Sequence, residues 1–160
     1  MPITLLHFGL LAPINHFAPK KVSNVSFILT SIWIDGKSIL YVLFGLPGIA
    51  HGVEHSFLGA LVLSGIVAIF GFRSRKWILG AVLGGITHVL LDMCVHIEME
   101  PLLPIKGNVF YMDWMAPLSL ALLPFTIWFI AQSVSNILGW VRKIHEPVAA
   151  EKWKPSHEEH

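Results

Sequence analysis

The sequence predicts an all-α protein, an integral membrane helical bundle of four to five membrane-embedded helices. Three observations lead to this prediction. Of the 160 residues, 54% are hydrophobic and 13% are charged, about half the charged share that is usual in soluble domains. Long uncharged apolar segments recur along the chain. Within one of them, Gly80, Gly84 and Gly85 have the small-residue spacing that lets membrane helices approach closely.

Three segments are the strongest candidates for spanning helices. A helix needs ~17–25 mostly apolar residues to cross the hydrocarbon core of a bilayer. The second segment reaches this length if its helix continues to about Val95. The segments, none of which contains Asp, Glu, Lys or Arg, are residues 56–72, 77–91 and 114–131.

Weaker apolar segments precede them. Residues 3–17 and 22–34 predict a helical hairpin that turns at residues 18–21. Residues 37–50 are apolar but contain helix-breaking residues, which leaves a short helix and a re-entrant piece as alternatives. The start of the chain has no basic region or cleavage site typical of a signal peptide. The chain is expected to divide into a membrane-embedded helical domain with the metal site, residues 1–141, and a polar cytoplasmic tail, residues 142–160.

Basic residues in short loops predict the orientation of the helices. Lys and Arg are enriched in cytoplasmic loops, and three basic clusters lie at residues 20–21, 73–76 and 142–143. Placing all three on the cytoplasmic side makes the protein a multi-pass protein of the cell membrane. The loop between residues 98 and 113 and the functional site then lie toward the outer face.

This orientation brings ionisable residues from distant segments to one level of the membrane. Such residues are costly within a membrane and are functional-site candidates by default. His51 and His55 lie at the outer end of one helix, and His88 and Asp92 at the outer end of its antiparallel neighbour. The complete candidate set is His7, Asp35, His51, His55, His88 and Asp92.

The residue types in this set are typical of a divalent metal site. Residues four apart share a helix face, so each of the two pairs can ligate one ion. Imidazole with carboxylate suits zinc, iron or manganese, and zinc is the favoured cofactor, as one or two ions. Asp35 and Asp92 are candidates to bridge two ions, and Asp35 is also a candidate catalytic base. His96 lies four residues after Asp92 on the same face, with Glu98 just beyond it, and either is a candidate to orient the ligands.

Glu54 is a second candidate catalytic residue. The stretch HGVEH matches the inverted zinc-protease pattern, in which the glutamate is the general base. The pattern is short and arises by chance, so a protease is the less favoured interpretation. The simplest alternative for both pairs is a set of buried hydrogen bonds between helices.

Several stretches together resemble a known family. HGVEHSFLGA, ITHVLLDMCVHIEMEPLLPIKGNVFY and SIWIDGKSILYVLFGLP are similar to motifs of the membrane-bound metal-dependent hydrolases, which include LexA-binding, inner-membrane-associated hydrolases and small archaeal relatives. The resemblance covers His7 to Tyr111 and implies the same six metal ligands. It also implies a relationship to zinc-dependent phospholipase C, and hence lipid or phosphoester substrates. Lys37 departs from the family, which often carries an acidic residue there.

The leading functional hypothesis is a membrane-bound metal-dependent hydrolase that acts on a lipid-like or phosphoester substrate through metal-activated water. The alternative is a non-catalytic accessory subunit of a membrane complex, with a structural metal or a polar cluster. A metal or proton transporter is less favoured, because no charged residues line the inner halves of the spans. Expected partners are membrane lipid and further copies or subunits. Nucleic acid is not expected, because the net charge is only +1.

Overall fold

The computed structural model describes residues 4–45, 51–115, 117 and 120–145. Every regular element in these ranges is a helix, which confirms the all-α prediction. Packing divides the chain into two units, Met1–Phe129 and Ile130–His160. The predicted tail beyond residue 145 and the helix breakers Pro47 and Gly48 lie outside the described residues. The division expected after residue 141 stays a prediction.

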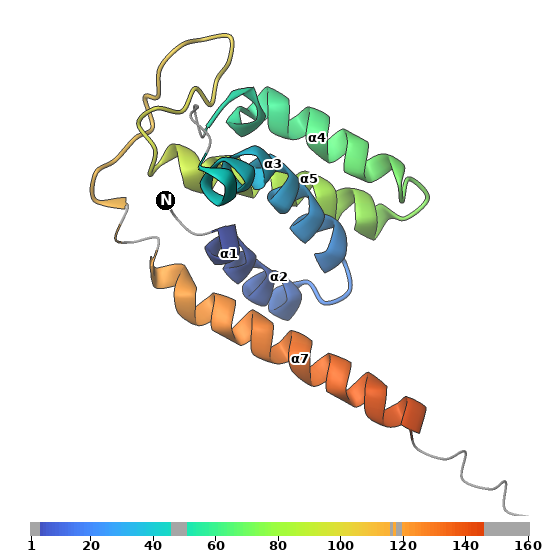
Figure 1. Cartoon of the computed structure of the whole chain (residues 1–160). Coiled ribbons are helices and arrows are strands. Elements are labelled where there is room, and N and C mark those ends of the chain that lie inside the picture. The colour runs from blue at the N-terminus through green and yellow to red at the C-terminus, as the bar shows by residue number, and fades with distance from the viewer. Residues whose placement is uncertain (1–3, 46–50, 116, 118–119, 146–160) are drawn as a thin grey trace, which may run out of the picture. The chain divides into compact units, whose positions relative to one another are not determined.

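The first unit begins with the predicted helical hairpin (Figure 1). Its first arm comprises α1 (Thr4–His7), η1 (Phe8–Leu10) and α2 (Leu11–Phe17), and its second arm is α3 (Asn24–Phe44).

The helix α3 continues without interruption through Asp35 and Lys37, where the sequence suggested separate segments. Asp35 is only 7% exposed, so its carboxylate faces the protein interior and does not end the helix. The helix ends instead at Gly45, whose φ of 60° suits a left-handed C-cap.

Two further helices complete the first unit. A 3₁₀ turn, η2 (Val53–His55), precedes α4 (Phe57–Ile69), and a short turn then leads to α5 (Arg75–Met93). Serine side chains cap both helices, because Ser56 accepts a hydrogen bond from the Gly59 N–H and Ser74 from the Trp77 N–H. With 13 residues, α4 is shorter than the segment expected at residues 56–72.

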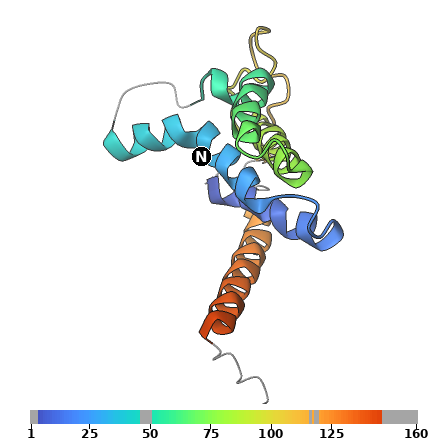
Figure 2. The same cartoon turned by 90° about the vertical axis from the view of Figure 1, so that its right-hand side faces the viewer.

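The helix α5 packs against both α3 and α4 (Figures 1 and 2). Its glycines permit this approach, as their spacing predicts. A Cβ atom on Gly84 would lie 2.5 Å from the Phe27 carbonyl oxygen of α3, and one on Gly85 would collide with Ser64 of α4. The glycine face therefore brings the backbones of three helices together, and the candidate site residues with them.

Two apolar clusters form the core of this unit. One joins α2 and α3 to the first turns of α7 (Leu123–His145), and the other lies among α3, α4, α5 and the loop that follows α5. The buried members of the second cluster, which packs beside the site, are Ile34, Ala60, Val89, Met93 and Met99.

The loop after α5 is fixed by hydrogen bonds to the helix ends. The Asn108 side-chain amide donates to the carbonyl oxygens of Met93, at 2.6 Å, and of His96, at 2.8 Å. The Phe57 N–H donates to the Pro101 carbonyl oxygen at 2.9 Å, which ties the loop to the start of α4. The bond to Met93 pairs a carbonyl group that the end of α5 would otherwise leave unpaired.

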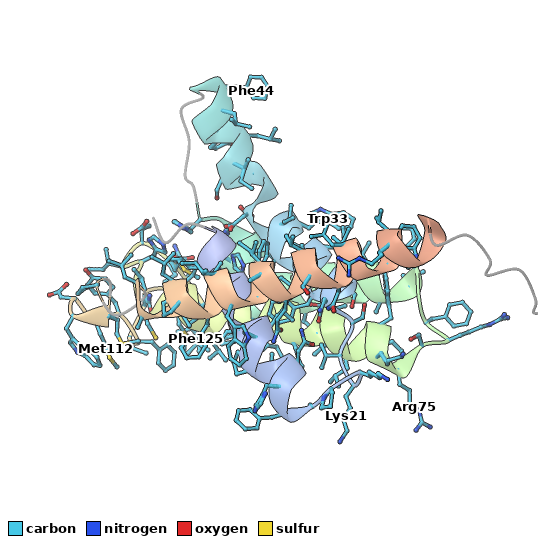
Figure 3. The ribbon with its side chains drawn as sticks, turned by 90° about the horizontal axis from the view of Figure 1, so that it is seen from below. Lys21, Trp33, Phe44, Arg75, Met112 and Phe125 are labelled. Atoms are coloured by element: carbon cyan, nitrogen blue, oxygen red, sulfur yellow. The ribbon has the colours of Figure 1, made fainter. Side chains whose placement is uncertain are left out.

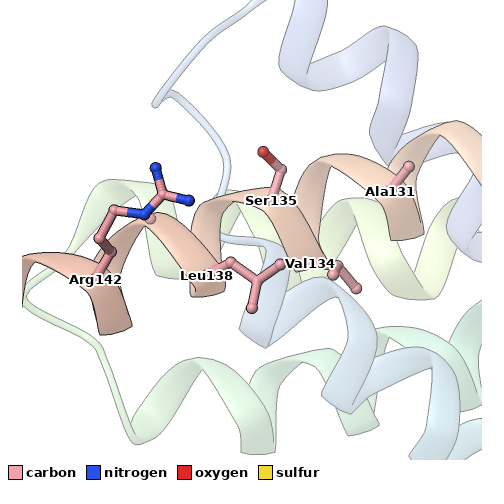
Figure 4. Close-up of a pocket in the computed structure, with 6 residues that line it drawn as sticks. Ala131, Val134, Ser135, Leu138 and Arg142 are labelled. Carbon is pink, nitrogen blue, oxygen red and sulfur yellow. The ribbon is translucent and has the colours of Figure 1, made fainter.

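The second unit contains the larger part of α7, which follows η3 (Leu120–Leu122). Ala131, Ser135 and Gly139 repeat at four-residue intervals along this helix. Together with Val134, Leu138 and Arg142 they line an open groove of about 560 Å³ (Figure 4).

Among the described residues, two helices are long and apolar enough to cross a membrane, by length and composition. They are Arg75–Met93 and the continuous helical stretch Leu120–Arg142. Large apolar side chains also lie at the protein surface, among them Trp33 and Phe44 of α3 (Figure 3). A surface of this kind is expected where helices contact lipid or another protein.

Candidate metal centre

The six predicted site residues come together in the first unit. They belong to five separate parts of the chain: α1, α3, the bend before η2, η2 itself and α5. Each is at most 7% exposed, although all six side chains are ionisable. Buried ionisable groups are rare unless they are paired or bind a metal. The six residues are His7, Asp35, His51, His55, His88 and Asp92.

Four of these residues form an inner group, which we define as Asp35, His55, His88 and Asp92. Their potential ligand atoms lie within 4.8 Å of one another. His88 Nε2 is 3.3 Å from Asp35 Oδ1 and 3.2 Å from Asp92 Oδ2. His55 Nε2 is 3.1 Å from the same Asp35 oxygen and 3.8 Å from the same Asp92 oxygen. Two nitrogens and two carboxylate oxygens thus surround one small volume.

These spacings match a metal coordination shell. Ligands in a tetrahedral zinc site with bonds of ~2.0–2.2 Å stand about 3.3–3.6 Å apart. The four nitrogen–oxygen distances, 3.1, 3.2, 3.3 and 3.8 Å, bracket this range. Two carboxylates also balance the charge of one divalent cation. The residues present therefore fit a divalent metal.

Hydrogen bonding leaves His88 incompletely satisfied. Its Nε2 atom is close to two carboxylates but makes no aligned hydrogen bond, and its Nδ1 atom has no partner among the described residues. His88 is 0% exposed, so water at the protein surface does not supply those partners. An orphaned buried nitrogen that faces two carboxylate oxygens is the arrangement that a metal ion satisfies.

His7 holds Asp92 from the opposite side. Its Nε2 atom is 3.1 Å from Asp92 Oδ1, and its ring stacks on that of His88 with centroids 4.2 Å apart. His7 is not one of the four ligands of the inner group, so its contacts suit a residue that orients a ligand. Its direct binding of metal stays a prediction.

A second group lies beside the first and consists of His51, Asp92 and His96. All three are buried, and their potential ligand atoms also lie within 4.8 Å of one another. The rings of His51 and His96 stack at a centroid distance of 4.0 Å. Sequence reasoning gave His96 only an orienting role. Its position four residues after Asp92, which continues the face of α5 that carries His88 and Asp92, is the sequence feature that could have indicated a ligand role.

The pair His51 and His55 differs from the predicted helical pair. Only His88 and Asp92 share the face of an α-helix, whereas residues 51–56 form a bend and a 3₁₀ turn. The helix starts late because Gly52 and Ser56 both have extended backbone angles, and Ser56 caps α4. As a result, His55 joins the inner group and His51 the second group.

Glu54 lies at the rim of the site. Its Oε1 atom is 3.4 Å from Lys37 Nζ and 3.9 Å from His55 Nδ1, and the second distance is too long for a hydrogen bond. Burial alone would raise the pKa of Glu54, but backbone hydrogen bonds and the Lys37 ammonium outweigh it and lower that pKa. Its role as a general base stays a prediction.

The two histidines of the second group favour the neutral form. Burial lowers the pKa of His51, and the neighbouring His55 lowers it further. Burial and the adjacent His51 likewise lower the pKa of His96. A metal ligand must be the neutral imidazole, so both side chains are available to an ion near neutral pH.

Among the histidines whose side chains are described, His16 lies outside the cluster. His16 is exposed and contacts the rings of Phe17 and Trp128. Nothing is described of the His145 side chain, and His157 and His160 lie outside the described residues.

Comparisons of the chain with family models, curated proteins and solved structures found no match in any of the three. The case for a metal centre therefore rests on the donor atoms of the two groups, their burial and their spacing.

Proposed function

We propose that the protein is a membrane-embedded, metal-dependent hydrolase that acts on a lipid-like or phosphoester substrate. The observation that carries the proposal is the inner group, in which two imidazole nitrogens and two carboxylate oxygens stand at metal-shell spacing. Imidazole and carboxylate ligands favour zinc, with iron or manganese as alternatives. A bound metal of this kind supplies a water of lowered pKa for attack on an ester.

In this proposal the protein side chains bind the cation and orient its ligands. His55, His88, Asp35 and Asp92 hold the cation, and His7 fixes Asp92 through the contact at 3.1 Å. Asp35 also contributes a carboxylate next to the reaction centre, where it can accept a proton from the attacking water. The resemblance of the sequence to membrane-bound metal-dependent hydrolases supports the same assignment.

An open groove beside the site supports a lipid-like substrate. It has a volume of about 480 Å³ and is lined mainly by apolar side chains, with Lys37 and Glu54 also among its residues. Such a volume lies within the ~300–1,000 Å³ typical of small-molecule sites. Two of the residues that line the groove, Gly36 and Glu54, are adjacent in sequence to Asp35 and His55. An acyl chain suits its apolar lining, and an anionic group suits Lys37.

The site lies toward the outer face of the membrane in this proposal. Basic loops on the cytoplasmic side, a cytoplasmic tail and a multi-pass bundle follow from the charge distribution of the sequence. The apolar helices Arg75–Met93 and Leu120–Arg142 support a membrane location. Reporter fusions at the C-terminus would test the orientation, and an outward C-terminus would contradict it.

Elemental analysis of the detergent-purified protein tests the metal site. We expect at least one equivalent of zinc, iron or manganese in the parent protein, and its loss in His88→Ala. His16→Ala is the matched control, because it removes an exposed histidine outside the cluster and should keep the metal. A folded parent protein that takes up no stoichiometric metal after add-back would overturn the proposal.

Hydrolysis assays test the reaction itself. Suitable probes are bis(p-nitrophenyl) phosphate and phosphatidylcholine in mixed micelles, each assayed with parent, His88→Ala and His16→Ala proteins. We expect turnover in the parent and the His16 variant and a loss of at least about 100-fold in the His88 variant, because even residues that only orient metal ligands cost ~10–100-fold in activity when they are mutated. A protein that binds metal but turns over neither probe would favour the accessory-subunit alternative.

A further inference from the structure

The inner group does not use all of the metal-binding side chains at this site. His51 and His96 are 7% and 8% exposed, yet neither belongs to that group. Both lie beside Asp92, which is common to the two groups. Two buried histidines next to a shared carboxylate are more than the inner cation requires.

We propose that the site holds two cations, the second bound by His51 and His96, with Asp92 as the bridging ligand. This inference rests on the proposed function, because it extends the same metal centre. It also assigns His96 as a direct ligand and Glu98 as the residue that orients His51.

The contact between His51 and Glu98 selects a ligand nitrogen. His51 Nδ1 is 3.1 Å from Glu98 Oε1. The Glu98 side chain is 52% exposed, and in this contact its carboxylate oxygen is the hydrogen-bond acceptor. His51 therefore donates from Nδ1, which leaves the lone pair of Nε2 for a metal. A carboxylate that holds a histidine in this way is a common feature of metal centres.

The loop after α5 holds His96 in position. The His96 N–H donates to the Asp92 carbonyl oxygen at 2.9 Å, which extends the ligand face by one more turn. Asn108 donates to the His96 carbonyl oxygen at 2.8 Å and fixes the turn from the other side. The ring is then stacked on His51 with an interplanar angle of 29°. Both imidazoles are thus held close together before any ion binds.

The Asp92 carboxylate can bridge two cations. Its Oδ2 atom faces His88 and His55 at 3.2 and 3.8 Å, while Oδ1 accepts from His7 at 3.1 Å. Each carboxylate oxygen has a second lone pair, which leaves ligand capacity toward His51 and His96. Metals that share a bridging carboxylate typically stand ~3.5–4 Å apart.

A two-cation site would narrow the substrate class. Paired cations at this separation stabilise both the attacking and the leaving oxygen of a displacement at phosphorus. Phosphoesters, including phospholipid headgroups, are therefore the substrates that this arrangement fits best, and Lys37 in the adjacent groove adds a positive charge for their phosphate.

Metal stoichiometry provides the main test. The full-length protein in detergent is stripped with a chelator, reloaded with Mn²⁺ and freed of excess ion, and bound metal is then counted. We expect two equivalents in the parent protein, one in His96→Gln and two in His16→Gln, the matched control. Circular dichroism and size-exclusion profiles identical to those of the parent would show that each variant is folded.

Electron paramagnetic resonance of the same samples tests the bridge. Two Mn²⁺ ions that share Asp92 should give an exchange-coupled spectrum in the parent, and His96→Gln should give the spectrum of an isolated ion. Two equivalents without coupling would overturn the bridging role of Asp92. Two equivalents retained in a folded His96→Gln protein would overturn the assignment of His96.

The same experiment separates this inference from the proposed function. One equivalent in the parent protein, unchanged in His96→Gln and lost in His88→Ala, would overturn the second cation and leave the single-metal hydrolase standing. No bound metal in the folded parent would overturn both.

Discussion

The helices α5 and α7 have similar apolar compositions but differ in what surrounds them. In the most apolar stretch of α5, 44% of the residues are buried, compared with 11% in that of α7. Both carry small residues at four-residue intervals. Those of α5 contact α3 and α4 closely, whereas no described residue lies within 4 Å of a Cβ placed on Gly139 of α7.

The same spacing of small residues therefore has different surroundings in the two helices. In α5 the small residues let neighbouring backbones approach, and this close packing encloses His88 and Asp92. The described part of α7 presents mainly apolar side chains at its surface, among them Ile137, Leu138 and Trp140. Apolar composition identifies both helices as membrane candidates, but only packing distinguishes the helix that builds the site.

The largest expected effect comes from filling the glycine face of α5. Gly84→Leu should destabilise the fold by about 3 kcal/mol or more, because overpacking a close contact typically costs ~1–3 kcal/mol and this contact is with backbone. Thermal unfolding in detergent measures the effect. Gly139→Leu is the matched control in α7 and should leave the unfolding temperature nearly unchanged. Equal effects of the two substitutions would contradict the comparison.

The next largest effect is expected on metal affinity, when a polar side chain of α5 is replaced and compared with one of α7. Asp92→Asn should weaken metal affinity by about 100-fold or more, because it removes the carboxylate common to both groups and neutral amide oxygens are weaker ligands. Asn136→Ala removes an exposed polar side chain of α7 and should leave affinity unchanged. Competition with a chromogenic chelator gives both constants. Unchanged affinity in Asp92→Asn would exclude Asp92 as a ligand.

Removal of the Asn108 side chain should have an intermediate effect. Asn108→Ala deletes two hydrogen bonds at the end of α5 and should cost about 1–3 kcal/mol, since each net bond contributes ~0.5–1.5 kcal/mol. Denaturant unfolding in mixed micelles measures the loss. Asn136→Ala again provides the control. A loss no greater than that of the control would show that the loop is held by other contacts.

The smallest effect is expected on the exposed face of α7. Leu138→Ala should change the free energy of unfolding by less than about 0.5 kcal/mol, as for surface substitutions in general. A buried Leu→Ala substitution costs ~2–5 kcal/mol. Thermal unfolding at several protein concentrations distinguishes the two cases. A large, concentration-dependent loss would show that another copy of the chain covers this face.

Much of the fold could be predicted from the sequence because long apolar segments favour helices. Apolar segments of sufficient length, separated by basic or glycine-containing turns, predict antiparallel helices. The direction of each helix then places its ionisable residues at one end or the other. This reasoning predicted the cluster of His7, Asp35, His88 and Asp92, and the structure confirms that these side chains meet.

Local backbone geometry was harder to predict. The spacing of His51 and His55 suggested a helix, but the cap at Ser56 delays the helix start and sends the two rings to different groups. Charge in an apolar segment suggested a break near Asp35, yet α3 accommodates it because the carboxylate finds buried histidine partners. The pairing of Glu54 with Lys37 likewise depends on contacts between distant segments.

By itself, the sequence determined the all-helical class, the apolar helices and the identity of the side chains that converge. These properties follow from composition and helical period, which act over short stretches of chain. The tertiary structure alone decided two features of the site. It divided the candidate ligands into two groups that share Asp92, and it placed His96 where it could also bind a metal. Ligand geometry depends on distances of a few ångströms between atoms far apart in sequence, and only the packing of α5 against its neighbours sets those distances.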